Sequence, residues 1–222
     1  MKVFLSIGTG PGIGFTTAER FAQDGFIVIL SARTQEKTRQ LSEQLRTKGY
    51  QAEAEQVDAT DVKAILSLVE RVRQKYGNID VLHYNAAVLR QAALREQSAE
   101  SFYADTAVNI SGALAAAWSV APVMEEAGAG TILLTGGHFG IEPNPDFLSL
   151  SVGKAGIRAI ALALFEPLKQ KNIHVGTVTV AAYVSPQTRE AREIGERFFS
   201  LYEQPADKWV PELDYSVTAS NE

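Results

Sequence analysis

Cysteine is absent from this chain of 222 residues, and so is any long run of basic side chains. Without cysteine the chain cannot form disulfides, thiolate zinc sites or iron–sulfur clusters, and it has no cysteine nucleophile. Its 21 basic and 26 acidic residues give a formal net charge of −5, which argues against a general nucleic-acid surface or a surface for anionic membranes. We therefore expect no nucleic-acid partner. We also expect no metal site, because His83 and His174 stand alone and lack metal-ligand spacing.

Targeting and membrane signals are also missing from the sequence. Residues 1–8 carry one basic side chain and no small-residue cleavage site, so they predict a first strand and not a signal peptide. We see no segment that approaches about 18 apolar residues without a charge, and we therefore expect no membrane span. The default expectation is a cytoplasmic protein.

Short apolar runs alternate with longer amphipathic segments along most of the chain. Nearly all-apolar strands separated by helices of at least about ten residues are typical of a parallel sheet covered on both faces. The pattern predicts a single α/β domain with a doubly wound, Rossmann-type parallel sheet and helices on both faces. The expected strands are 3–7, 27–31, 53–57, 79–84, 131–135 and 174–180, and the expected helices are 16–23, 35–47, 62–75, 100–126 and 148–169.

A cluster of glycines, GTGPGIG at residues 8–14, separates the first strand from the first helix. Glycine lets the backbone approach a pyrophosphate at a helix N-terminus, where free N–H groups favour negative charge. The spacing fits G-x-x-x-G-x-G on Gly8, Gly12 and Gly14, with Ile13 between the last two, whereas a P-loop fails because no Lys follows. We predict a dinucleotide site here; the alternative is a glycine-rich turn that serves only the tight strand-to-helix geometry.

Arg33 follows the second strand, where an acidic residue would bind the ribose of NAD. Its guanidinium, flanked by the hydroxyls of Ser31 and Thr34, suits a 2′-phosphate, so the sequence favours NADP(H) over NAD(H). The alternative is that Arg33 is a solvated residue in front of a polar helix. We assign residues 1–204 to a dinucleotide-binding domain and 205–222 to an irregular segment with at most a last strand, at 209–215, and a frayed tail from residue 216.

Taken together, these motifs resemble the short-chain dehydrogenase/reductase family over roughly residues 2 to 186. The glycine loop matches the cofactor signature of the family, and the remaining matches are in the family's order. They are Asp58, the adenine-contacting acid; Asn85, which with Ala86 is what remains of an N-N-A-G motif; Asn109 in V-N-x-x-G, an active-site residue that acts through a water relay; and Lys154, the catalytic Lys that also holds the nicotinamide ribose.

The resemblance also implies a catalytic Tyr and Ser, and both are missing. In the family a Tyr four residues before the Lys exchanges a proton with the substrate oxygen while hydride moves to or from the nicotinamide. Leu150 stands there, Phe147 stands at the position of a longer-spaced variant, and Gly137 replaces the Ser. The family's Pro-Gly beside the nicotinamide is replaced by residues 180–181, Val-Ala.

His138 is the residue that we consider first as a substitute acid, since it follows the vacant Ser position and its unperturbed pKa lies near neutrality. Tyr183, Ser149 and Ser151 are further candidates, and for each the alternative is a loop or helix residue without a catalytic task. The presence of Lys154 and Asn109 does not show that the protein is catalytic. Lys154 would also serve cofactor binding, and Asn109 would also pin a helix kink to the neighbouring strand.

The sequence is therefore consistent with two functions. One is an NADP(H)-binding oxidoreductase whose ordinary carbonyl or alcohol chemistry is weak or altered; the other is a non-catalytic nucleotide- or ligand-binding protein that acts as a sensor or partner subunit. Both imply a small-molecule substrate or ligand. The resemblance further implies a homodimer or homotetramer built on two alanine-rich helices (residues 113–117 and 159–163), although these alanines would equally pack on the sheet, and we expect the family's closing helix and strand to be missing.

Overall fold

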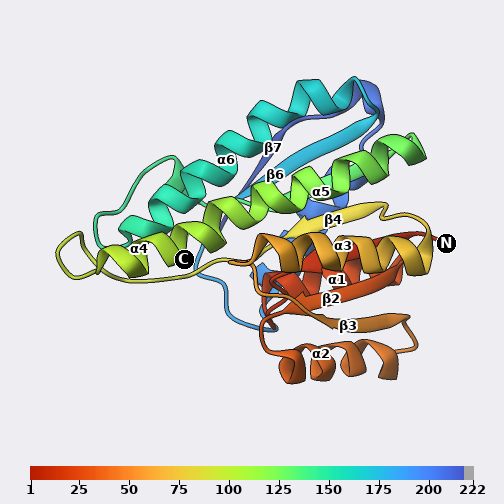
Figure 1. The fold of residues 1–222 in the computed structure, drawn as a ribbon, viewed down its shortest axis with the longest axis horizontal. Coiled ribbons are helices and arrows are strands. Elements are labelled where there is room, and N and C mark those ends of the chain that lie inside the picture. Colours follow the sequence, from red (N-terminus) through yellow and green to blue (C-terminus); the bar gives the residue numbers. More distant parts are fainter. Residues whose placement is uncertain (218–222) are drawn as a thin grey trace, which may run out of the picture.

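Seven parallel strands form the central sheet of the computed structural model, which describes residues 1–217 (Figure 1). The strand order is β3-β2-β1-β4-β5-β6-β7, so the chain reverses its direction of winding between the adjacent strands β1 and β4. This confirms the doubly wound α/β sheet. The strands are β1 (Val3–Ile7), β2 (Ile27–Ala32), β3 (Ala52–Gln56), β4 (Val81–Tyr84), β5 (Gly130–Thr135), β6 (Ile173–Ala181) and β7 (Glu212–Ser216).

Helices cover both faces of the sheet. The helices are α1 (Ile13–Gln23), α2 (Gln35–Thr47), α3 (Val62–Tyr76), α4 (Ala99–Thr106), α5 (Gly112–Ala127), α6 (Leu148–Lys169) and α7 (Arg189–Glu203). Successive side chains of a strand point to opposite faces. In β1, Leu5 and Ile7 accordingly join the core under α3, α5 and α6, while Phe4 joins the core under α1, α2 and α7.

A π-helical turn, η1 (Ala107–Ser111), joins α4 to α5, so that the three elements run as one long rod beside α6 (Figure 1). By length and hydropathy alone, this rod and α6 could each cross a membrane, which the sequence expectation did not foresee. In the rod residues 106–124 carry no charge at all. Half of the apolar window of the rod and 44% of that of α6 are buried, as in core helices that pack on a sheet.

A closing helix, α7, is present, so the expectation that it is missing is wrong, and the last strand that we allowed for is present as β7. Thr188 caps α7 by accepting a hydrogen bond from the Ala191 amide, and the buried residues Ala191, Ile194 and Phe198 follow at helical spacing. β7 pairs with β6 and overlaps the window 209–215 that we expected for a last strand, but it extends one residue further, to Ser216. The expectation that the frayed tail begins at Ser216 is therefore wrong; the part of that tail from position 218 on lies outside the described residues.

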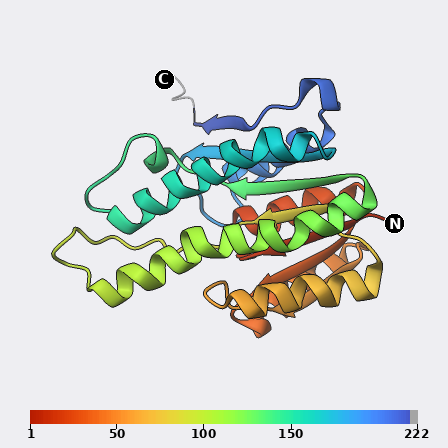
Figure 2. The ribbon, with the colours of Figure 1, turned by 45° about the horizontal axis from the view of Figure 1, so that its top comes forward.

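Two loops project beyond the carboxyl edge of the sheet, one after β4 and one after β5 (Figure 2). An isolated bridge pairs Ala92 with Phe147, and the Ala92 amide donates to the carbonyl of Asp146 at 2.7 Å. The second loop contains a short turn of 3-10 helix, η2 (His138–Gly140). The loops thereby frame the edge where the winding reverses, which is where ligands bind in open α/β sheets.

Candidate functional site

The glycine loop lies against the strand end of β4. Gly8 has a φ of +85°, and a side chain at this position would overlap the backbone of Ala86. A Cβ on Gly14 would lie 3.0 Å from the amide nitrogen of Asn85. Close packing therefore requires glycine at Gly8, and a side chain at Gly14 would need its neighbours to shift slightly, whether or not a ligand is present.

Gly12 is different, because a Cβ built on it meets nothing within 4 Å. Gly12 is the N-cap of α1, and the first helical bonds are made by the Phe15 and Thr16 amides, so the amides of Ile13 and Gly14 precede the hydrogen-bonded ladder. A cavity of about 430 Å³ opens in front of this helix end. The open space, the helix N-terminus and the glycine loop fit the pyrophosphate of a dinucleotide.

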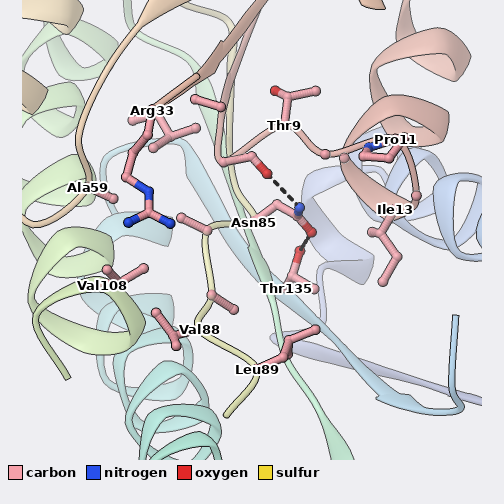
Figure 3. Close-up of a pocket in the computed structure, with 18 of the residues that line it drawn as sticks. Thr9, Pro11, Ile13, Arg33, Ala59, Asn85, Val88, Leu89, Val108 and Thr135 are labelled. Carbon is pink, nitrogen blue, oxygen red and sulfur yellow. Dashed lines mark hydrogen bonds between the residues drawn. The ribbon is translucent and has the colours of Figure 1, made fainter. Parts of the chain in front are cut away.

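Cationic side chains line one end of the cavity. Arg33 extends into it toward Ala59 (Figure 3), and Thr34 and Lys37 line it as well. Thr34 is the N-cap of α2 but its hydroxyl makes no capping bond, so it is available to a ligand. Lys37 was not among the sequence candidates; its position in the first turn of the helix after Arg33 is the signal that could have identified it.

Asp58 lies beside the cavity but does not line it, whereas its neighbours Val57 and Ala59 do. Its carboxylate accepts two hydrogen bonds from Thr60, from the amide at 2.9 Å and from the hydroxyl at 2.8 Å. These bonds, with a smaller contribution from the Arg33 charge, hold the pKa of Asp58 below its usual range. Asp58 is thus a fixed negative charge at the rim of the cationic end.

Asn85 links the glycine loop to the middle of the sheet (Figure 3). Its side-chain amide donates to the carbonyl of Gly8 at 2.9 Å, and its oxygen accepts from the Thr135 hydroxyl at 3.0 Å. Thr135 in turn lies 3.0 Å from Nε2 of His83, which is fully buried and whose pKa is lowered to about 3 by desolvation and, secondarily, by the charge of Lys154. His83 is therefore a neutral residue of the core.

Asn109 lies in the π-helical turn, where it is 3% exposed. Its side-chain oxygen accepts from the Val88 amide at 2.7 Å, and its amide group points back to the Val88 carbonyl at 3.4 Å. Asn109 therefore fastens the helix kink to the segment that follows β4. Val88, on the other side of this contact, lines the cavity.

Lys154 lies on the second turn of α6 and lines the cavity. Its ammonium donates to the backbone carbonyl of Thr135 at 2.7 Å, and its stem lies over Gly137. Desolvation lowers the pKa of the Lys154 amine to about 8. This side chain thus supplies a basic group that titrates close to neutral pH.

The two vacant family positions lie next to Lys154. A Cβ at Gly137 would stand 3.1–3.2 Å from three carbons of the Lys154 side chain, so the lysine stem fills part of the space that a Ser would need. Leu150 is buried in the first turn of α6. Neither position brings a hydroxyl to the reacting end of the cavity.

The candidate substitute acids are placed elsewhere. His138 does not line the cavity, and its ring lies 3.2 Å from the carboxylate of Glu142 on the surface. Tyr183 is 94% exposed. Ser149 donates to Asp105 at 2.8 Å, and Ser151 is hydrogen-bonded to the backbone of Asn144, so both hydroxyls serve the local structure.

Apolar side chains also line the cavity, among them Val88, Leu89 and Val184. Residues 180–181 replace the Pro-Gly of the family, and here they form the end of β6, at Ala181. Val184, three residues further on, lines the cavity. Within residues 1–217 no group of three or more His, Asp and Glu side chains is arranged to hold a metal ion. The site thus combines polar, cationic side chains with apolar ones and with Lys154.

Sequence comparisons identify similar proteins over most of the chain. A family model described as short chain dehydrogenase matches residues 2–195. The 3-oxoacyl-(acyl-carrier-protein) reductase FabG of Thermotoga maritima is 31% identical over 192 residues, which cover 86% of this chain and 78% of that protein. A 3alpha-hydroxysteroid dehydrogenase of Mediterraneibacter gnavus is 25% identical over 179 residues, which cover 80% and 72% of the two chains.

Solved structures agree with these matches. A metagenomic short-chain oxidoreductase in complex with NADP superposes with a TM-score of 0.89 at 25% identity, over 97% of this chain and 98% of that chain. A short-chain dehydrogenase from Rhodopseudomonas palustris superposes with a TM-score of 0.90 over 98% and 99% of the two chains. At 22% identity the second likeness shows the shared fold alone.

Proposed function

Because this chain belongs to the short-chain dehydrogenase/reductase family of oxidoreductases, we propose that it binds NADP(H) in the 430 Å³ cavity and is a weak catalyst of ordinary carbonyl and alcohol chemistry. The proposal rests on the difference between the cofactor-binding part of the cavity and the part where the reaction would take place. The cofactor half of the cavity has its glycine loop, helix N-terminus and two cations, while the reacting half has Gly137 and Leu150 where a proton-transferring pair would stand.

Each residue of the cofactor half has a separate task in this proposal. The amides of Ile13 and Gly14 bind the pyrophosphate, because they precede the first helical hydrogen bonds and the helix end favours negative charge. Arg33 and Lys37 bind the 2′-phosphate, which NAD(H) lacks. Asp58 faces the adenine side, and Asn85 keeps the loop on the strand.

At the other end, NADP(H) supplies hydride chemistry when it is bound. Lys154 binds the hydroxyls of the nicotinamide ribose, and Asn109 fixes the segment that carries Val88. Loss of a general acid lowers a rate typically by ~10²–10⁴-fold, so proton transfer in this site depends on water or on Lys154 itself. A substrate whose reduction needs little acid assistance, such as a polarised C=C bond, suits this site better than a simple ketone.

A non-catalytic role is the second candidate, and the apolar part of the cavity lining favours it. Leu150 and Gly137 stand where the family has two hydroxyl side chains, and the apolar side chains of Val88, Leu89 and Val184 line the cavity. Such a pocket suits the retention of an apolar ligand better than proton transfer. The protein would then sense nucleotide or ligand, or act as the partner subunit of an active relative.

Titration of the purified protein with NADPH and NADH, followed by cofactor oxidation over a panel of ketones, aldehydes and enones, separates these functions. Micromolar NADPH binding, weaker NADH binding and slow turnover of a member of the panel support the oxidoreductase. NADPH binding without any turnover favours the sensor or partner role. Absence of binding up to about millimolar nucleotide, an affinity of roughly 4 kcal/mol, removes both nucleotide-based functions.

We also propose that the chain assembles through the outer faces of α5 and α6. Leu114 and Trp118 on α5 are exposed, as are Val152 and Leu162 on α6. The alanines that the sequence suggested for this contact lie mainly inward, since Ala113, Ala116, Ala117 and Ala161 are buried in the core. The large apolar side chains on the same helices would therefore make the contact.

A further inference from the structure

Lys154 carries an amine that lines the cavity and donates its hydrogen bond to a backbone carbonyl. Its hydrogen-bond partner is the carbonyl of Thr135, and in residues 1–217 no carboxylate forms an ion pair with it. The side chain is half-buried and lines the cavity together with Val88, Leu89 and Val184. A ligand that enters the cavity therefore meets the nitrogen without first displacing a counter-ion.

We propose that Lys154, in the nucleotide-free protein, captures small apolar aldehydes as a covalent imine. The neutral amine has two N–H bonds and one lone pair. The hydrogen bond to Thr135 engages one N–H, so the lone pair is directed away from that carbonyl and is free to attack.

The step balances without any further reactant. The amine nitrogen attacks the carbonyl carbon of the aldehyde and a C–N bond forms. The carbonyl oxygen then leaves as water, taking both hydrogens of the amine, and a C=N bond remains. The product is a neutral imine, whose hydrocarbon part would lie against the apolar wall of the cavity.

Charged groups near Lys154 are already paired or neutral, so they do not compete for the amine. Arg158, one turn further along α6, pairs with Glu212 at 2.9 Å, and His138 on η2 pairs with Glu142 at 3.2 Å. His83 on β4 is buried and neutral. Desolvation lowers the pKa of Lys154 to about 8, so a substantial fraction of the amine is uncharged at mildly alkaline pH.

Capture goes beyond the proposed hydride chemistry and uses the same side chain. The proposed function assigns Lys154 to the ribose of the cofactor, so imine formation belongs to the state without nucleotide. The chemistry needs neither the missing Tyr nor the missing Ser. An incomplete catalytic set is therefore compatible with covalent retention of an aldehyde.

Site-resolved trapping tests this proposal on the unmodified chain. The nucleotide-free protein is treated with hexanal and cyanoborohydride, which reduces an imine to a stable secondary amine, and peptide mass spectrometry gives the labelling rate of each lysine. We expect Lys154 at pH 7.5 to react at least about tenfold faster than the exposed Lys63, because desolvation lowers the pKa of the Lys154 amine to about 8. The rate at Lys154 should level off above pH ~9, where its amine is already uncharged.

Matched variants complete the test. Lys154→Arg, with its folding checked by thermal unfolding, should lose the fast label, and Lys63→Arg should retain it. Labelling of Lys154 at the rate of Lys63, or a fast label that persists in Lys154→Arg, would overturn the proposal. Both readings are independent of nucleotide binding, so failure here is distinct from failure of the proposed NADP(H) function.

Discussion

The hydroxyl of Tyr84 donates a hydrogen bond of 2.5 Å to the backbone carbonyl of Val108 in the π-helical turn. The ring is 1% exposed, and burial raises the pKa of the phenol well above its ordinary value. A side chain at Gly112 would overlap both this hydroxyl and the carbonyl of Ala59. Tyr84 stands where the family usually has Asn, so this chain fastens its helix kink to β4 by a tyrosine as well as by Asn109.

Removal of the Tyr84 hydroxyl should destabilise the fold. Tyr84→Phe leaves the Val108 carbonyl buried without its donor, which costs about 1–3 kcal/mol in the free energy of unfolding. Gly112→Ala should be more severe, because the added methyl meets backbone as well as the Tyr84 ring. Urea unfolding measures both changes, with Tyr103→Phe, a 74% exposed tyrosine, as the matched control. A Tyr84→Phe variant as stable as the control contradicts a structural role for the hydroxyl.

The cationic end of the cavity should set the choice of cofactor. Arg33→Ala and Lys37→Ala should each weaken NADPH binding by about tenfold, or ~1.4 kcal/mol, and leave NADH binding nearly unchanged. The measurement is fluorescence titration with both nucleotides at a fixed salt concentration. Lys63→Ala, a change at an exposed lysine outside the cavity, is the control. Equal losses for NADPH and NADH would assign these side chains to a part that both cofactors share.

The missing hydroxyls should be restorable. Gly137→Ser combined with Leu150→Tyr supplies the family's pair beside Lys154, whose stem must shift by a few tenths of an ångström to admit the new side chain. We expect NADPH oxidation with simple ketones to rise by about 10²-fold, the usual contribution of a general acid. Gly137→Ser with Leu150→Phe, which adds the ring without the hydroxyl, is the matched control. If both double variants are equally slow while NADPH binding is intact, the defect lies outside these two positions.

His83 should make the fold less stable in acid. Its pKa is about 3 in the folded protein and about 6.5 when exposed, so below pH 6.5 the unfolded chain binds more protons than the folded one. The stability that the neutral ring contributes is present above about pH 6.5 and is lost as the pH falls toward 3, by up to ~1.4 kcal/mol per pH unit. Comparison of urea unfolding for the wild type and His83→Asn between pH 4 and pH 7 checks this. Parallel pH profiles for the two proteins would show that the ring does not titrate as described.

The exposed ring of Trp118 should report on assembly. If α5 and α6 form the contact between copies of the chain, Trp118→Glu places a charge in an apolar interface and should shift the protein toward monomer. Sedimentation velocity over a range of concentrations measures this shift. Tyr103→Glu on α4 is the control for a charge at an exposed aromatic position. An unchanged sedimentation coefficient for Trp118→Glu would direct attention to another surface.

Much of the fold follows from local patterns in the sequence. Apolar strands and amphipathic helices predicted six of the seven strands within a few residues, and the range 148–169 coincides with α6. Inside the expected helix at 100–126 we considered a kink held by Asn109, but the contribution of Tyr84 to the π-helical turn depends on a tertiary bond that the sequence does not show. The closing helix was missed although its signals, a Thr188 cap and buried residues at helical spacing, are present in the sequence.

Prediction of the site was less complete because most motif residues do more than one task. The three motif glycines match the pattern equally well in the sequence. In the fold, however, Gly8 and Gly14 pack closely against their neighbours, whereas Gly12 faces open space where a ligand could bind. Ser149 and Ser151 flank position 150, but only the fold shows that both hydroxyls are engaged by Asp105 and Asn144. Lys37 can be recognised as a candidate binding residue from the fold, because the first turn of α2 places it at the cavity.

The bond between Thr135 and Asn85 also determines where the proton of His83 lies. Thr135 has a single hydroxyl hydrogen, and it is donated to the side-chain oxygen of Asn85, whose amide orientation is fixed by its bond to Gly8. The Thr135 oxygen must then accept a hydrogen from Nε2 of His83, while Nδ1 is buried with no hydrogen-bond partner in the described part of the chain. His83 is therefore held as the Nε2–H tautomer. The hydrogen bonds therefore all donate in one direction, from His83 in the core of the sheet through Thr135 and Asn85 to the carbonyl of Gly8 in the glycine loop.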